Sequence, residues 1–245
     1  ARGGPAGGNG GRIETSGYRL DVNQIRVDTS AQHPLGSAGE WLLDPYSITI
    51  ANADFDVFCS AGNFSPNGTA STVSVTTLKG ALSNSNVTVQ APGDVYVASP
   101  IVFPAFTSPT PRGLLLLAGN NIALGCGVPV CVDASPFSGA EVYLTATGGG
   151  VVGNGSVLLS PTGFLAVNQG GSTQWSGGVV NGYFNKFGAG TLSVAGGAWS
   201  GLAGSMILEG SLEVTGGTAS PSALSFGNLS VDSGASPSHR GFRRI

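Results

Sequence analysis

The residues best suited to chemistry in this chain are two carboxylates spaced i, i+2. Asp54 and Asp56 would share one face of a strand, because side chains alternate across a strand. Paired carboxylates can bind calcium or act as acid and base on a glycan. Such sites take further ligands from neighbouring segments, yet residues 134–233 contain only a few acidic residues, namely Glu141, Glu209, Glu213 and Asp232. We therefore interpret Asp54 and Asp56 as part of a solvated face and predict no metal site.

Other catalytic and cofactor motifs are missing from the sequence. A nucleophilic triad needs a positioned histidine, and the two histidines are His33, before a proline, and His239, near the end of the chain. The chain has no G-x-S-x-G sequence, no phosphate-binding G-x-x-x-x-G-K-[ST] sequence and no calcium-binding nonapeptide repeat. We predict no catalytic residue and no cofactor, and thus a protein that is not an enzyme.

The cysteines leave two alternatives. Cys126 and Cys131 are separated by four residues, and we predict either a small disulfide loop or two unpaired thiols. Cys59 stands alone in an apolar stretch and is interpreted as a buried hydrophobic residue.

Aromatic side chains are the remaining candidates for ligand recognition. Trp175, Tyr183 and Trp199 lie in a glycine-rich region, where bulky side chains either fill the core or stand outside. An exposed row of them would stack on sugars, and these three are the candidate binding residues. The alternative interpretation is that they fill the core.

Composition indicates the elements that would position these residues. Glycine accounts for 41 of 245 residues, charged residues for 9 % and hydrophobic residues for 41 %. Apolar residues alternate with small polar ones in short runs such as 87–89, 95–97 and 192–194. This pattern predicts many short strands joined by tight turns and almost no helix. The net charge of −3 and the absence of a basic cluster outside Arg240, Arg243 and Arg244 argue against nucleic-acid binding.

An internal repeat narrows the fold. The segment 190–197 has the pattern G-x-L-x-V, which returns at 210–217 and again at 227–234. Strand repeats near 20 residues are typical of solenoids, in which each turn buries its aliphatic residues against the next. We predict an all-β protein with a right-handed, single-stranded parallel β-helix of coils of about 20 residues. One continuous β-helix is expected over 1–237, with loop excursions near 59–72 and 100–112 and a basic, disordered tail at 238–245.

Two motifs near the start carry a family resemblance. The residues Glu14, Thr15, Ser16 and Gly17 form an E-T-S-G turn, and Trp41, Leu42, Leu43, Asp44 and Pro45 form a W-L-L-D-P sequence. With the strands that follow up to about residue 98, this order resembles the filamentous haemagglutinin and high-molecular-weight adhesin family of two-partner secretion exoproteins. The repeat at 190–234 is similar to those of autotransporter passengers. Trp41 to Pro45 also has a structural interpretation, as a large apolar group followed by a sharp corner.

The resemblance implies a virulence-associated protein that leaves the cell through an outer-membrane transporter pore. It implies an extracellular or cell-surface location, a host-cell or matrix glycan or protein as receptor, and a monomeric shaft. The family's amino-terminal secretion domain is not found in the chain, so we expect the chain to be one segment of a longer protein, with its signal peptide elsewhere. The longest aliphatic run, residues 114–118, is far shorter than a membrane span of about 20 residues.

The function expected from these features is that of a structural shaft and adhesive surface of a bacterial exoprotein. Two alternatives stay open at this point. One is a β-helical polysaccharide lyase or hydrolase, because this fold hosts such enzymes. The other is a structural protein of the envelope or biofilm without a receptor.

Overall fold

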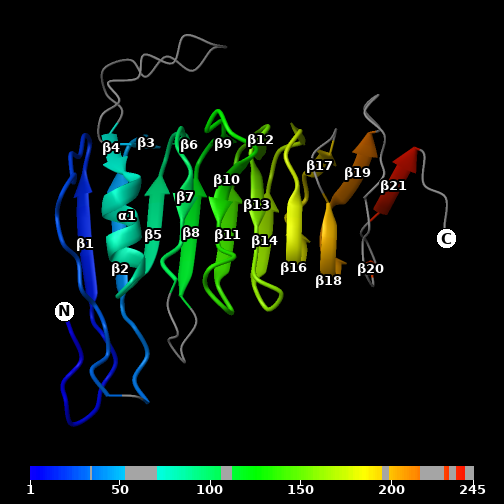
Figure 1. Ribbon diagram of the computed structural model, residues 1–245. Helices are drawn as coiled ribbons and strands as arrows, with labels where there is room; N and C mark the ends of the chain where they lie inside the picture. Colours follow the sequence, from blue (N-terminus) through cyan, green and yellow to red (C-terminus); the bar gives the residue numbers. More distant parts are fainter. Residues whose placement is uncertain are drawn as a thin grey trace.

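The strands of the molecule stack side by side along one axis and form a parallel β-helix (Figure 1). The structure is a computed structural model that describes residues 1–33, 35–52, 71–105, 112–194, 199–215, 229–231 and 236–240. Every pairing between its strands is parallel. The predicted all-β solenoid is therefore confirmed.

Two long sheets form most of the wall. Sheet 1 contains β1 (Arg12–Gly17), β2 (Glu40–Pro45), β5 (Asn86–Ala91), β8 (Gly113–Ala118), β11 (Glu141–Ala146), β14 (Phe164–Gln169), β16 (Val179–Phe187), β18 (Ser200–Ile207) and β20 (Leu229–Val231). Sheet 2 contains β4 (Ser71–Ser74), β3 (Ile48–Ala51), β6 (Val95–Val97), β9 (Ile122–Leu124), β12 (Val151–Gly153), β15 (Thr173–Trp175), β17 (Thr191–Val194), β19 (Ser211–Thr215) and β21 (Ser236–Arg240).

A third, shorter row of strands completes each coil. It consists of β7 (Ile101–Val102), β10 (Val130–Asp133) and β13 (Ser156–Leu158), and it joins sheet 1 through β16. The first residues of β16 pair with β13 and its later residues pair with β14. Between them Asn181 and Gly182 have φ of 64° and 72°, a left-handed conformation that suits Asn and Gly and turns the strand from one row to the next.

The core consists of inward-facing side chains stacked in register. One row runs through successive strands of sheet 1, from Trp41 through Val87, Leu114, Val142 and Leu165 to Phe184. Each of these side chains is buried. Because burying one large apolar side chain contributes about 1.5–3 kcal/mol, the stacked rows stabilise the column although each strand is short.

The predicted coil length is correct for only part of the chain. Hydrogen bonds between equivalent corners of successive coils span 27 to 29 residues between Asn86 and Gly150. They span 19 to 23 residues from Gly139 onward. The longer coils arise because the connections beside the third row are longer there, and these loops lack a periodic pattern.

The sequence repeat is in register for two of its three copies. Leu192 pairs with Leu212, as the repeat predicts. The third copy does not continue this row, because Leu229 lies in β20 and pairs with Ser205 of sheet 1. The strand that follows β19 in sheet 2 is β21, where Pro237 pairs with Leu212.

The predicted loop at 100–112 and the predicted tail at 238–245 both overlap with strands of the structure. Ile101 and Val102 of β7 pair with Val132 and Asp133, so the start of the expected excursion at 100–112 belongs to the wall. Residues 53–70 and 106–111 lie outside the described residues. The expected tail at 238–245 begins inside β21, which ends at Arg240.

The one helix in the described part of the chain was not predicted. Helix α1 (Val75–Leu82) begins after Ser74, whose hydroxyl accepts a hydrogen bond from Thr77 N at 3.0 Å. The helix contains β-branched residues and Gly80, which have weak helix propensity. It forms because Leu78 and Leu82 are fully buried beside β5 and β7, and this packing outweighs local preference.

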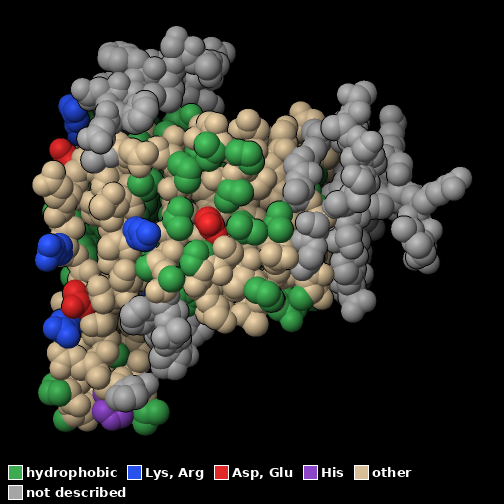
Figure 2. All heavy atoms as spheres, viewed as in Figure 1, with side chains coloured by type: hydrophobic (Ala, Val, Ile, Leu, Met, Phe, Trp, Pro, Cys, Tyr) green, Lys and Arg blue, Asp and Glu red, His purple; other side chains and the backbone are tan. Residues whose placement is uncertain are grey.

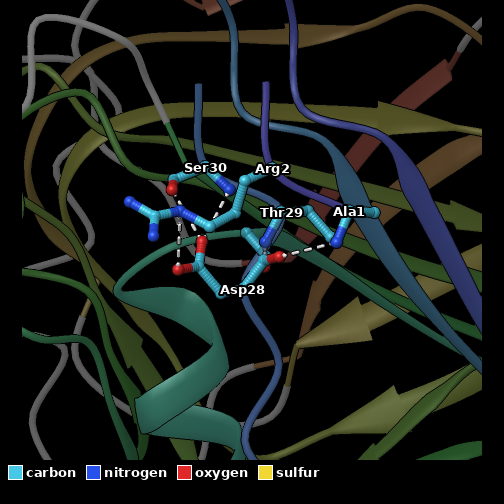
Figure 3. A network of polar contacts seen from close by, with 6 residues as sticks. Ala1, Arg2, Asp28, Thr29 and Ser30 are labelled. Carbon is cyan, nitrogen blue, oxygen red and sulfur yellow. Dashed lines mark hydrogen bonds and ion pairs between the residues drawn. The ribbon is translucent and has the colours of Figure 1, made fainter. Parts of the chain in front are cut away.

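The segment before β2 is held across the first coil by polar contacts. Asp28 Oδ1 accepts hydrogen bonds from Ser30 N and Ser30 Oγ at 2.9 and 2.6 Å, and Arg2 Nε lies 3.2 Å from Asp28 Oδ2 (Figure 3). Burial raises the pKa of Asp28, but the hydrogen bonds from Ser30 and the charge of Arg2 outweigh it and leave the pKa below its usual value. The same segment bonds to α1, where Gln24 N donates to Thr77 Oγ1.

Glycines at the corner between sheets 1 and 2 allow successive coils to approach closely. A Cβ atom on Gly119, Gly170 or Gly190 would overlap a backbone carbonyl oxygen of the preceding coil. Gly170 N donates to Ala146 O at 3.0 Å, which fixes its position. These glycines are required by contact with the neighbouring coil and not by a left-handed backbone.

We expect Gly170→Ala to lower the free energy of unfolding by about 2 kcal/mol, because the added methyl group pushes the corner away from Thr147. Urea unfolding followed by circular dichroism measures the change. Gly80→Ala is the matched control, since nothing lies within 4 Å of its Cβ position and alanine favours a helix by up to about 1 kcal/mol. Equal losses in both variants would contradict close stacking at this corner.

Candidate functional site

Two of the three aromatic candidates for ligand binding are buried. Trp175 and Trp199 have exposed fractions of 0 %. Their indole N–H groups donate to backbone carbonyls, Trp175 to Gly155 O at 2.9 Å and Trp199 to Gly177 O at 3.2 Å. Of the two interpretations, the structure contains the core-filling one for Trp175 and Trp199, because the coil turns both rings into the core.

Tyr183 is the aromatic candidate that reaches solvent. It lies on β16, points away from the core and is 46 % exposed. Its neighbour in register on β14 is Phe164, which is half-buried and also faces outward. The two form part of an outer row on sheet 1.

The structure joins Cys126 and Cys131 in a disulfide beside the third row of strands. Both residues are buried, and Cys126 N lies 3.1 Å from Cys131 Sγ. Of the two alternatives for this pair, the structure contains the small covalent loop. Cys59 lies outside the described residues.

The two sequence motifs lie side by side in space. Glu14, Thr15, Ser16 and Gly17 do not form the expected turn. They belong to β1 and pair in register with Leu42, Leu43, Asp44 and Pro45 of β2. Trp41 is fully buried, and its indole N–H donates to Thr15 Oγ1 at 3.1 Å. The motifs therefore form the contact between the first two layers of sheet 1.

The remaining sequence candidates are not brought together. Glu213 accepts a hydrogen bond from Ser193 Oγ, and His33 Nδ1 accepts one from Leu35 N in an exposed turn. Asp54 and Asp56 lie outside the described residues. Across the ranges that the structure describes, no group of three or more His, Cys, Asp or Glu side chains is arranged to hold a metal ion.

A groove on the outer face of sheet 1 is the best-formed candidate site. Its hollow has a volume of about 440 Å³, and a second hollow of about 420 Å³ beside β1 and β2 shares Ala38 and Asn86 with it. We call it the sheet-1 groove, and the first hollow is lined by Ser37, Ala38, Asn86, Val87, Thr88, Gly113, Leu115, Glu141 and Tyr143.

The groove exists because one position in an outward row is a glycine. The row crosses sheet 1 from Glu40 and Asn86 through Gly113 and Glu141 to Phe164. A Cβ on Gly113 would meet only Glu141 O and Asn86 Oδ1, at 3.8 and 3.9 Å, so the space above it is open. The side chains of Asn86 and Glu141 thus form the two walls.

Polar contacts hold one wall of the groove in place. Asn86 Oδ1 accepts a hydrogen bond from Gly113 N at 2.9 Å. Thr88 Oγ1 donates to Glu40 Oε1 at 2.6 Å, and Arg12 Nε lies 3.3 Å from Glu40 Oε2. These groups are therefore engaged with one another.

The other wall is less fully engaged. Tyr143 Oη donates to Glu141 Oε2 at 3.1 Å, and burial, followed by the charge of Glu141 and this hydrogen bond, raises the pKa of Tyr143. Glu141 forms no ion pair with any side chain in the described part of the chain. The groove therefore combines an aromatic ring with a carboxylate that has remaining acceptor capacity.

Sequence reasoning missed this site. The sequence patterns single out Glu141 only as an isolated carboxylate and do not indicate Asn86, Gly113 or Tyr143 as site residues. The outward-facing residues of 113–118 and 141–146 can be predicted from the sequence, because apolar and other residues alternate throughout both segments. The placement of these two segments side by side cannot be predicted in this way. The offset between the strands is 28 residues, whereas the sequence repeat has a period of 20 residues.

Comparison of the chain with models of protein families, with curated proteins and with solved structures gave no match. Among the helices of the described residues, none has the length and apolar character needed to cross a membrane.

Proposed function

We propose that the chain is a segment of a secreted or surface-displayed bacterial exoprotein of the filamentous haemagglutinin type, serving as structural shaft and adhesive surface. The observation that carries the proposal is the pairing of the E-T-S-G and W-L-L-D-P motifs on adjacent strands of a long parallel β-helix. The resemblance rests on these residues, and their contact gives the motifs one shared structural role.

Two further features support export. The Cys126–Cys131 disulfide is typical of oxidising compartments such as the periplasm and the cell exterior. Each coil contacts mainly its neighbours, so the chain can fold layer by layer as it emerges from an outer-membrane pore.

The surface also suits a shaft. On the face shown in Figure 2, the charged side chains of the described residues gather toward the N-terminal end, and much of the rest is uncharged. A surface with few charges and many short polar side chains offers broad contact area for adhesion, spread along the column.

The location is tested with antibodies raised against the 245-residue chain and applied to the source bacterium. Labelling of intact cells, or recovery of the protein from the culture medium, is expected. Labelling that requires permeabilised cells would overturn the proposal.

Beads coated with the purified chain test adhesion to host cells and matrix, with albumin-coated beads as control.

The alternative function is that of a polysaccharide-active enzyme, and the sheet-1 groove is where it would act. The two carboxylates there, Glu40 and Glu141, lie on strands separated by β5 and β8. Three strand spacings of about 4.8 Å place their backbones roughly 14 Å apart, against roughly 5–9.5 Å between paired catalytic carboxyl groups. This separation favours a binding function over hydrolysis. Depolymerisation of pectin, alginate or glycosaminoglycans by the purified chain would instead support the enzymatic function.

A further inference from the structure

We propose that the sheet-1 groove binds a neutral, hydroxyl-rich glycan. This inference rests on the proposed adhesive function and names the ligand class and the residues that contact it. The contact residues are Glu141 and Tyr143, which line the groove.

The direction of the groove follows β8. Gly113 and Leu115 of β8 form its floor, and β5 and β11 form its walls. A sugar above Gly113 can therefore meet the side chains of Glu141 and Tyr143, which stand on the same wall.

The aromatic side chains supply the apolar contacts that sugar rings need. The rings of Tyr143 and Phe164 lie 5.8 Å apart at an angle of 60°, and both are half-buried against the wall. Held rings of this kind offer large contact area at low entropic cost, and Tyr143 is the ring that lines the hollow.

Glu141 supplies the polar contact. Its Oε2 accepts the hydrogen bond from Tyr143, while no donor in the described part of the chain reaches its Oε1. An ionised carboxylate accepts hydrogen bonds from hydroxyl groups that are shorter and stronger than neutral ones. Glu141 lines the hollow above Gly113, where a sugar hydroxyl would lie.

The charge of the groove selects against acidic glycans. Glu40 and Glu141 line the two hollows, and Arg12, the cation among the lining residues, is already paired with Glu40. A sulfated or uronic-acid chain would bring like charges beside Glu141. The structure thus assigns a neutral glycan and not a glycosaminoglycan.

The test measures binding of cellohexaose, mannohexaose and a heparin-derived hexasaccharide to the 245-residue chain by calorimetry. Two variants remove the site differently: Tyr143→Ala deletes a stacking ring, and Gly113→Phe fills the hollow. Tyr46→Ala is the matched control, because Tyr46 is a 50 % exposed tyrosine whose ring stacks on Tyr18, outside the groove. Circular dichroism checks that each variant is folded, and Tyr143→Ala decides the matter if Gly113→Phe does not fold.

We expect a neutral hexasaccharide to bind the unmodified chain and Tyr46→Ala equally, and Tyr143→Ala to bind it roughly tenfold more weakly. Gly113→Phe should abolish binding. No binding of either neutral probe, unchanged binding in Tyr143→Ala, or tighter binding of the heparin probe would overturn the inference. Coated beads that still adhere to cells after Tyr143→Ala would show that adhesion stands while this groove is not its site. Glycan binding without bead adhesion would show that the groove binds a glycan although the chain does not mediate adhesion.

Discussion

Replacing Trp175 with alanine is expected to lower the free energy of unfolding by about 3–5 kcal/mol. The side chain is fully buried, and its ring meets that of Trp199 edge to face at 5.6 Å. Trp199 in turn meets Phe184 at 5.1 Å, so three aromatic rings form one cluster. Alanine would leave a cavity there and would remove the hydrogen bond to Gly155 O.

Urea unfolding followed by circular dichroism measures this loss, because the signal does not depend on tryptophan. Tyr183→Ala is the control, since it removes an exposed aromatic side chain from a nearby strand and should change stability by no more than about 0.5 kcal/mol. Trp175→Phe keeps most of the ring packing and should fall between the two. A Trp175→Ala variant as stable as Tyr183→Ala would mean that Trp175 is outside the core.

The second large effect is expected at Lys186, a cation inside the column. Lys186 occupies an inward row that is otherwise aliphatic, between Val167 and Ile207. Its side chain is fully buried, and Nζ donates to the carbonyl oxygens of Phe187 and Gly188 at 2.6 and 2.7 Å. A third, longer bond of 3.3 Å reaches Glu209 O in the next coil.

Burial lowers the pKa of Lys186 to about 8, although the charge of Glu209 acts in the opposite direction. Between pH 8 and 10.5 the unfolded chain therefore binds a proton that the folded chain has released. Under this condition the free energy of unfolding increases with pH. From pH 7.5 to pH 10 we expect a rise of about 2–3 kcal/mol that is specific to Lys186.

The measurement is the free energy of unfolding of the unmodified chain and of Lys186→Met across this pH range. Methionine preserves the apolar stem and cannot titrate, so the difference between the two profiles isolates the lysine. Parallel profiles would contradict the prediction and would mean that the three carbonyl acceptors keep the ammonium group charged throughout.

The sheet-1 groove and Lys186 illustrate the same limit of sequence reasoning. Alternation correctly assigns Leu114 and Leu116 to the core and Leu115 to the outside, because side-chain direction along a strand is local. The same rule places Lys186 inside, a result that composition alone would not suggest. The carbonyl oxygens that accept hydrogen bonds from its ammonium group belong to two coils, so the pattern of one strand does not identify them.

Local patterns were sufficient for the fold class, the short strands, the turn residues and the register of Leu192 with Leu212. Each of these depends on residues that are close in the chain or on a repeat that is nearly exact. The tertiary structure alone decided the 27-residue to 29-residue coils, the placement of Leu229 in sheet 1, the burial of Trp175 and Trp199, and the hollow above Gly113. The physical reason is that register between coils depends on loop lengths and on contacts across the column, and neither leaves a periodic trace in the sequence.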